Sequence, residues 1–233
     1  MEGTDTKIAP IIGSPKAARV ILKLWAKHHS RTADLVVIEG PKAGGHLGYT
    51  REQVKMHESD GYEKEIREIL DVVKEFEEKF HKKIPVIFGG GIFDKKDIEH
   101  YLSLGLSGVQ MATRFVATKE CDASEAFKNM YVKAKEKDVT IVQSPVHMPG
   151  RALLNPFVCA VQQRRMPVTN CFHCLKTCDP GTTPYCITQA LIRAVKGDVD
   201  HGLVFCGANA WKINKITTVH DLFTELVEGT AKA

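Results

Sequence analysis

The sequence lacks the features that mark exported, membrane-spanning and nucleic-acid-binding chains. Its N-terminus reads Met-Glu-Gly-Thr-Asp, with no basic stretch ahead of an apolar one, so we expect no signal peptide. No apolar run approaches the length of a membrane span. The sequence also has no large excess of charge of one sign, because its 32 lysines and arginines are interleaved with 28 acidic residues and the net charge is +4. We therefore expect a cytoplasmic protein that binds neither membranes nor nucleic acid.

Cysteine is present but unevenly placed. The chain has seven cysteines, and four of them fall within residues 171–186. Their spacing is Cys171-x2-Cys174-x3-Cys178, with Cys186 eight positions further on. Thiolates that lie close together in a loop with proline and glycine suit an iron–sulfur cluster or a structural zinc ion. The spacing matches neither a zinc ribbon nor a ferredoxin, so free thiols, reduced in a cytosolic setting, are the alternative.

What the sequence does contain is a buried strand that leads into a glycine-rich loop around one histidine. Residues 35–38 are an apolar, mostly β-branched run, typical of strands buried on both faces of a parallel sheet. The chain then turns at Gly40 and passes through glycines at positions 44, 45 and 48, which surround His46. Glycine lets a backbone come close to a ligand. Because (β/α) enzymes carry their chemistry at the C-terminal ends of strands, His46 is the first candidate for a catalytic residue.

The first 138 residues repeat a strand followed by a helix. We predict parallel strands, adjacent in sequence order, near residues 8–12, 35–38, 86–88 and 108–111. The apolar periodicity predicts helices near residues 15–29, 61–79, 94–104 and 124–137, and a long polar loop over residues 50–60. Four such units are half of the eight that close a (β/α)₈ barrel.

The pattern changes beyond residue 138. Residues 139–142 read as one more strand, and a proline-marked loop follows at 144–150. Helices are expected near residues 187–196 and 219–228, on either side of a short apolar segment at 202–207. We therefore divide the chain into a (β/α) part, residues 1–138, and a C-terminal extension with the cysteine-rich segment, residues 139–233.

Three segments in the (β/α) part resemble one known family. Residues 43–48, Ala-Gly-Gly-His-Leu-Gly, resemble the Ala-Gly-Gly-His-x-Gly motif of the FMN-dependent nitronate monooxygenase (2-nitropropane dioxygenase) family, which includes the flavin-type enoyl-acyl-carrier-protein reductases. The likeness continues at residues 85–92 and 108–115. It implies a TIM barrel of which the second half is present, with the cysteine-rich extension after it. Either the chain is a fragment, or another chain or a second copy supplies the missing half-barrel.

The resemblance also implies a set of FMN-binding residues. Glycine turns and helix N-termini offer backbone amides to a phosphate, and residues 89–91 and 110–113 fit that task. The family usually has glycine where Ala112 stands, and many members have glutamine where Glu39 stands. A carboxylate beside a reduced flavin is unfavourable, so we expect Glu39 to be protonated or turned away. The residues expected at the cofactor are Glu39, Gly44, Gly45, Gly90, Gly91, Gln110, Met111, Ala112 and Thr113.

The resemblance gives His46 the role of active-site histidine. It would act as a general base on the acidic carbon of a nitroalkane, or as a hydrogen-bond donor to a nitronate oxygen. The implied activity is the FMN-dependent oxidation of a small alkyl nitronate to a carbonyl compound and nitrite. Two alternatives stay open: an enoyl-thioester reductase that uses NADH or NADPH on the same scaffold, and a non-catalytic fragment or metal-thiolate protein without flavin chemistry.

Overall fold

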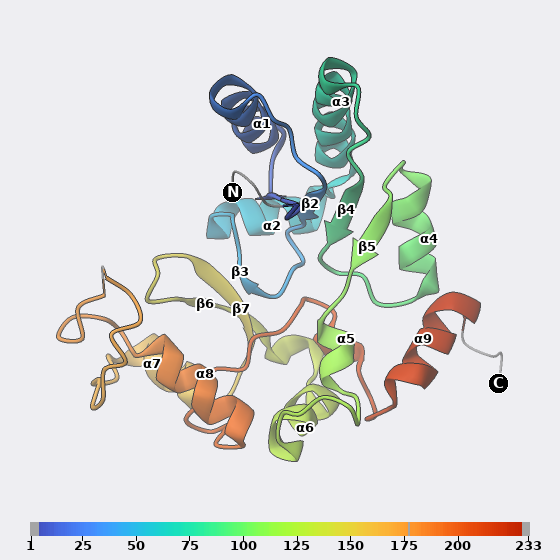
Figure 1. Cartoon of the computed structure of the whole chain (residues 1–233). Helices are drawn as coiled ribbons and strands as arrows, with labels where there is room; N and C mark the ends of the chain where they lie inside the picture. Colours follow the sequence, from blue (N-terminus) through green and yellow to red (C-terminus); the bar gives the residue numbers. More distant parts are fainter. Residues whose placement is uncertain (1–4, 177, 230–233) are drawn as a thin grey trace.

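A four-stranded parallel sheet forms the centre of the molecule. The structure is a computed structural model that describes residues 5–176 and 178–229. Its strands are β1 (Ile11–Ile12), β2 (Val36–Glu39), β4 (Val86–Gly89) and β5 (Gly108–Gln110), in the spatial order β1-β2-β4-β5 (Figure 1). Every neighbouring pair is parallel, as predicted. Glu39 lies beside Gly89, and Gly89 beside Gln110, so three strands end in one row.

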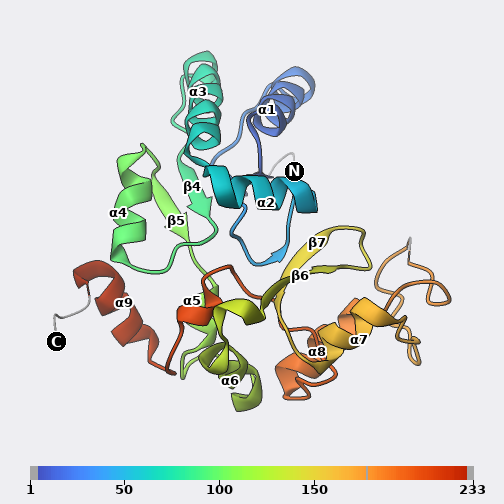
Figure 2. The same ribbon diagram turned by 180° about the vertical axis from the view of Figure 1, so that it is seen from behind.

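Three helices pack against this sheet: α1 (Pro15–His29), α3 (Glu63–Phe80) and α4 (Lys95–Ser103). Helix α1 begins where predicted, because Ser14 accepts a hydrogen bond from the Ala17 amide and Pro15 occupies the first turn. Helices α1 and α3 lie side by side in both views (Figures 1 and 2). The buried face of α3 joins the sheet side chains of β2 and β4 in one hydrophobic cluster.

The predicted loop over residues 50–60 is wrong, because this segment forms helix α2 (Arg51–Asp60). Its composition is polar, but it carries a complete capping box. The Thr50 side chain accepts from the Gln53 amide, and the Gln53 side chain accepts from the Thr50 amide. The helix predicted to reach residue 137 also ends early, since α6 (Glu125–Lys133) gives way to the 3₁₀ helix η1 (Glu136–Asp138).

A second, antiparallel sheet joins the glycine loop to the extension. Its strands are β3 (Gly45–His46), β7 (Pro149–Leu153) and β6 (Val139–Gln143), in the order β3-β7-β6. The predicted strand at 139–142 is therefore present, and the proline-marked loop turns back into β7. Gly45 pairs with Arg151, and His46 with Gly150. The boundary near residue 138 stays a prediction, but these pairs show that the His46 loop is fixed in place by residues beyond it.

The extension continues through helices that lie beyond the C-terminal ends of the parallel strands. These are α7 (Pro156–Gln163), which was not predicted, and α8 (Ile187–Lys196) and α9 (Val219–Glu228), which were. The short helices α5 (Thr113–Val116) and η2 (Ala210–Lys212) lie near the middle of the molecule (Figure 2). Within the described residues, no helix is long and apolar enough to span a membrane.

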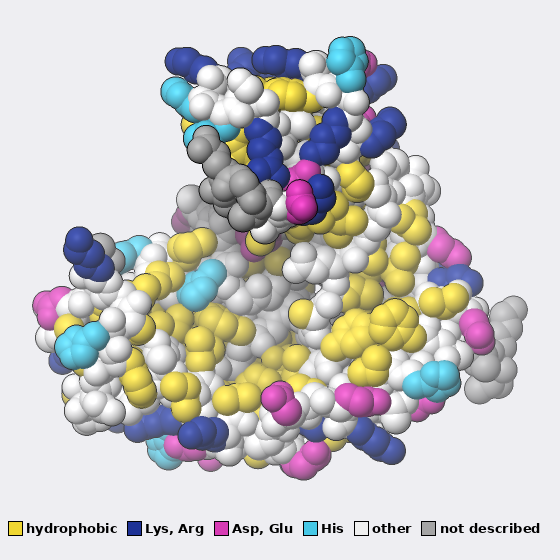
Figure 3. Space-filling model, viewed as in Figure 1, with side chains coloured by type: hydrophobic (Ala, Val, Ile, Leu, Met, Phe, Trp, Pro, Cys, Tyr) yellow, Lys and Arg dark blue, Asp and Glu magenta, His cyan; other side chains and the backbone are white. Residues whose placement is uncertain are grey.

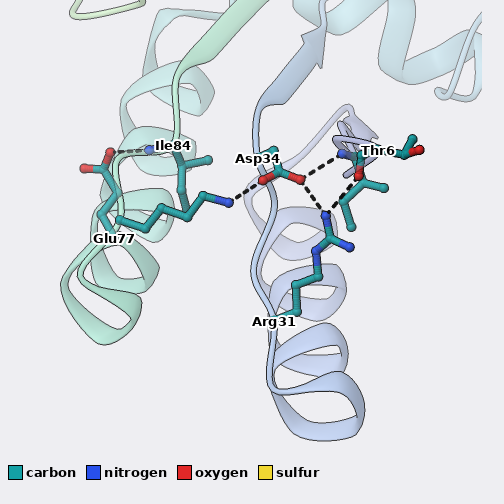
Figure 4. A network of polar contacts seen from close by, with 7 residues as sticks. Thr6, Arg31, Asp34, Glu77 and Ile84 are labelled. Atoms are coloured by element: carbon teal, nitrogen blue, oxygen red, sulfur yellow. Dashed lines mark hydrogen bonds and ion pairs between the residues drawn. The ribbon is translucent and has the colours of Figure 1, made fainter. Parts of the chain in front are cut away.

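A polar network fastens the opposite, N-terminal end of the parallel sheet (Figure 4). Asp34, just before β2, accepts hydrogen bonds from the Ile8 amide at 2.9 Å and from Arg31 at 2.7 Å, and it also pairs with Lys82. Nearby, Glu77 of α3 accepts from the Ile84 amide at 2.7 Å. These bonds hold the segments that enter β1, β2 and β4.

Candidate functional site

One cavity of about 310 Å³ lies at the C-terminal ends of the parallel strands. This is the end at which (β/α) proteins bind ligands. The face drawn in Figure 3 is hollowed near its centre, and apolar side chains gather around the hollow. All nine residues expected at the cofactor line the cavity: Glu39, Gly44, Gly45, Gly90, Gly91, Gln110, Met111, Ala112 and Thr113. The three resembling segments therefore meet at one place.

The glycines of the site are required by close backbone packing. Gly90 has a φ of 126°, and a Cβ on it would lie 2.9 Å from the Ala43 nitrogen. A Cβ on Gly44 would lie 2.6 Å from the carbonyl carbon of Cys206. Both distances are shorter than real Cβ contacts allow, so neither position accepts a side chain without movement of the backbone. The glycine loop, the turn after β4 and the segment around Cys206 are thus packed backbone against backbone.

The turns expected to hold a phosphate keep their amides free of side-chain caps. Within the described residues, no side chain accepts a hydrogen bond from the amides of Gly90, Gly91, Ala112 or Thr113. Thr113 instead uses its hydroxyl to accept from the Gly207 amide at 2.9 Å. That these four amides point at a common spot stays a prediction.

His46 lies beside the cavity, next to residues that line it. Gly45 and Phe205 line the cavity, whereas His46 is not among the lining residues. The His46 ring meets the Phe205 ring edge on, with centroids 5.1 Å apart. Its Nε2 atom lies 2.7 Å from the Ser144 hydroxyl oxygen. Burial lowers the pKa of His46 below its ordinary value of 6.5, and it therefore favours the neutral imidazole.

Glu39 lines the cavity as a half-buried carboxyl group. Burial raises its pKa, and the hydrogen bond that it accepts from the Gly48 amide at 2.9 Å opposes this rise. The raised pKa is in the direction of the first of the two expectations for Glu39, which were that it is protonated or that it is turned away from the flavin. Tyr49 donates a hydrogen bond to the Glu39 carbonyl oxygen, which fixes the backbone at the end of β2.

Several residues of the site could not be found by reading the sequence. Arg151 is 2% exposed and donates to the carbonyl oxygens of Pro41 and Ala43, so it holds the glycine loop from behind. Asn209 donates to the Gly91 carbonyl oxygen. Ser144 and Phe205 contact His46. The sequence of residues 202–207 indicates a short apolar segment, but nothing in its pattern indicates contact with the glycine loop.

The metal site predicted at Cys171, Cys174, Cys178 and Cys186 is not formed by the described residues. All four cysteines line a separate pocket of about 240 Å³ and have free thiols. However, no three or more described histidine, cysteine or acidic side chains converge as metal ligands. The sulfurs have other neighbours: Cys174 contacts the Thr188 hydroxyl at 3.1 Å, and Cys171 accepts from the His173 amide at 3.4 Å.

The chain is similar in sequence to proteins of staphylococci. It is 31% identical over 156 residues to a protein of Staphylococcus aureus strain Newman named as a probable nitronate monooxygenase, which is 67% of this chain and 38% of that one. A protein of Staphylococcus saprophyticus with the same name is 28% identical over 132 residues, 56% of this chain and 35% of the relative. The matches thus span well under two thirds of the relatives.

Solved structures share the fold. FabK from Thermotoga maritima superposes with a TM-score of 0.69 at 26% identity, over 96% of this chain and 60% of FabK. Nitroalkane oxidase from Streptomyces ansochromogenes gives 0.65 at 20% identity, over 96% of this chain and 58% of that one. The chain thus shares the α/β fold of these proteins and covers 58–60% of their length. The family profile of nitronate monooxygenase matches residues 2–229, and this chain therefore belongs to the nitronate monooxygenase family.

Proposed function

We propose that this chain carries the flavin site of an FMN-dependent oxidoreductase that converts alkyl nitronates to carbonyl compounds and nitrite. One observation carries the proposal. The nine residues that the resemblance assigns to the cofactor come from three separate stretches of sequence, and all of them line one cavity. Membership of the nitronate monooxygenase family supports the same conclusion.

The residues of the cavity fit FMN. Gly45 lines the cavity, and a Cβ on it would meet no atom within 4 Å, so the space beside its backbone is open to a flat ring system. The uncapped amides after β4 and β5 suit the phosphate. Lys42 lines the cavity and supplies a positive charge near Gly91. When bound, FMN supplies the electron transfer, and the protein supplies its position and its surroundings.

His46 is the residue that we assign to the substrate. A neutral imidazole beside the cavity can accept a proton from the carbon of a nitroalkane or donate a hydrogen bond to an anionic nitronate oxygen. Loss of a general base costs about 10²–10⁴-fold in rate. The two roles therefore differ in His46→Asn, which would spare preformed nitronates if His46 were a base and would slow both substrates if it were a donor.

In the proposed site this chain binds FMN by itself, and further (β/α) segments would cover the part of the flavin that it leaves exposed. Within the described residues, β1 and β5 each have a strand on one side and none on the other. Parallel sheets are normally buried and their strands paired. We propose that another chain, or a second copy of this one, supplies the strands that pair with β1 and β5 at these two edges.

An enoyl-thioester reductase on the same scaffold is the second candidate. The likeness to FabK favours it. Flavin-loaded protein mixed anaerobically with either an alkyl nitronate or NADPH separates the two. We expect the nitronate to bleach the flavin absorbance and, once air is admitted, to yield nitrite. Bleaching by NADPH and not by nitronates would replace the proposal with the reductase.

A further inference from the structure

Ser144 is a buried hydroxyl held against the imidazole of His46. Its exposed fraction is 1%, and its Oγ lies 2.7 Å from His46 Nε2. The contact follows from the antiparallel sheet. Strand β7 pairs with both β3, which carries His46, and β6, which ends one residue before Ser144. The turn that connects β6 to β7 is closed by the Ser144 amide, which donates to the Met148 carbonyl oxygen at 3.0 Å.

The hydrogen-bond partners of Ser144 decide which way this contact runs. The Val146 amide donates to Ser144 Oγ at 3.4 Å, so this oxygen already acts as an acceptor. The hydroxyl proton still needs an acceptor, because a buried donor left without one costs about 1–3 kcal/mol. Among the described residues, His46 Nε2 is the one acceptor within reach of that proton. Ser144 therefore donates, and Nε2 accepts with its lone pair.

We propose that Ser144 is a positioning residue that fixes His46 as the tautomer protonated at Nδ1. Since Nε2 is occupied as an acceptor, the proton of the neutral ring resides on Nδ1. Nδ1 has no hydrogen-bond partner among the described residues, so it is the ring nitrogen left for a ligand. The lowered pKa of His46 agrees with a neutral ring.

This tautomer selects one of the two roles of His46, and in this it rests on the proposed function. A ring that presents Nδ1–H to the substrate donates a hydrogen bond and has no free lone pair with which to take a proton. His46 would then bind the negatively charged oxygen of a nitronate, and it would equally suit the carbonyl oxygen of a thioester. The opposite tautomer would place a proton between Nε2 and Ser144 and leave the buried hydroxyl without an acceptor.

Nitrogen NMR of the chain tests the tautomer without flavin or substrate. In ¹⁵N-labelled protein, long-range correlations from the carbon-bound ring protons report the protonation of each ring nitrogen, and His46→Asn identifies the signals of His46. We expect an unprotonated Nε2 and a protonated Nδ1. A protonated Nε2 would overturn the proposal, whatever the protein turns out to catalyse, while a correct tautomer in a protein that is inactive on nitronates would count against the proposed function alone.

Variants add a second readout. In Ser144→Ala, the Nε2 signal of His46 should shift towards that of a protonated nitrogen, because the donor that held the tautomer is gone. Ser144→Thr keeps the hydroxyl and should restore the wild-type signal. Thr32→Val removes another buried hydroxyl, one that makes no contact with His46, and should leave it unchanged. An unchanged tautomer in Ser144→Ala would contradict the role of Ser144. If that variant fails to fold, the wild-type spectrum alone decides.

Discussion

Gly90 and Ala43 approach so closely that a Cβ on the glycine would lie 2.9 Å from the backbone nitrogen of Ala43. The two residues come from different loops, the turn after β4 and the glycine loop after β2. Their contact brings two of the three stretches that line the cavity together. The site is therefore built by backbone packing, and changes at its glycines should act on its shape before they act on its chemistry.

Gly90→Ala should destabilise the protein more than the same change at another glycine of positive φ. Gly105 has a φ of 95°, but a Cβ there would meet Leu70 at an ordinary 3.7 Å. We expect Gly105→Ala to lower the free energy of unfolding by about 1–2 kcal/mol through backbone strain alone. Gly90→Ala should cost more, because overlap with Ala43 adds to strain. Urea unfolding measures both free energies of unfolding. Equal losses in Gly90→Ala and Gly105→Ala would mean that the Ala43 backbone moves aside at little cost.

Removing the charge of Asp34 should weaken the fold and flatten its response to acid. Hydrogen bonds from Lys82 and the Ile8 amide hold the pKa of Asp34 well below its ordinary value of 3.8. A carboxyl group whose pKa is lower in the folded chain stabilises it above the unfolded pKa, and this stability is lost as the pH falls through the folded pKa. Asp34→Asn should therefore lower the free energy of unfolding near pH 7 by about 1–3 kcal/mol.

The pH series provides the control. Below about pH 4 the difference between Asp34→Asn and the wild type should shrink, because Asp34 of the unfolded wild-type chain takes up a proton there while Asp34 of the folded chain stays ionised. Asp71→Asn, which changes an exposed aspartate of α3, should leave both stability and its pH dependence as they are. If the free energies of unfolding of Asp34→Asn and the wild type differ by the same amount at every pH, the charge of Asp34 contributes nothing to stability.

Thr32→Val should stabilise the protein. The Thr32 hydroxyl oxygen is buried and has no hydrogen-bond partner in the part of the chain that the structure describes, and the residue is 2% exposed. Replacing the hydroxyl with a methyl group of similar shape removes an unpaired polar atom, which should raise the free energy of unfolding by about 1 kcal/mol. Thr32→Ser keeps the hydroxyl, removes the methyl group and should destabilise. A loss of stability in Thr32→Val would show that this oxygen does find a partner in solution.

Lys42→Gln should weaken FMN binding about tenfold, which is the effect of losing one charge-assisted hydrogen bond of about 1.5 kcal/mol. Lys42 is exposed, lines the cavity and lies against Gly91. Arg114 also lines the cavity, but its guanidinium is engaged by Glu225 at 2.7 and 2.9 Å. Lys23→Gln on α1 provides the matched charge change away from the cavity. Equal affinities of Lys42→Gln and Lys23→Gln for FMN would show that Lys42 does not bind the cofactor.

The sequence allowed prediction of those parts of the fold that depend on local pattern. Apolar runs and helix periodicity predicted the four parallel strands and their order, because each strand–helix unit is encoded within neighbouring residues. Helix α2 was missed because its side chains are polar, and its start is marked by one capping box. The capping box at Thr50 and Gln53 is a better indicator of this helix than its polar composition.

The candidate site divides in the same way. Its glycines are recognisable in sequence because close backbone approach leaves no other residue possible, and all of the predicted cofactor residues line the cavity. Ser144 was not recognisable, since it meets His46 across 98 positions of sequence and depends on the pairing of β3 with β7. The cysteines show the opposite case, because close spacing in sequence does not bring their sulfurs together as metal ligands among the described residues.

A titration of the purified chain with FMN, followed by quenching of flavin fluorescence, tests the central claim most directly. The account predicts saturable binding of one FMN per cavity by the wild type. It predicts loss of that binding in Gly44→Ala, whose Cβ would lie 2.6 Å from the Cys206 backbone. Circular dichroism would verify that the variant is folded. Failure of the wild type to bind FMN, or equal binding by a folded Gly44→Ala, would contradict the assignment of this cavity as the flavin site.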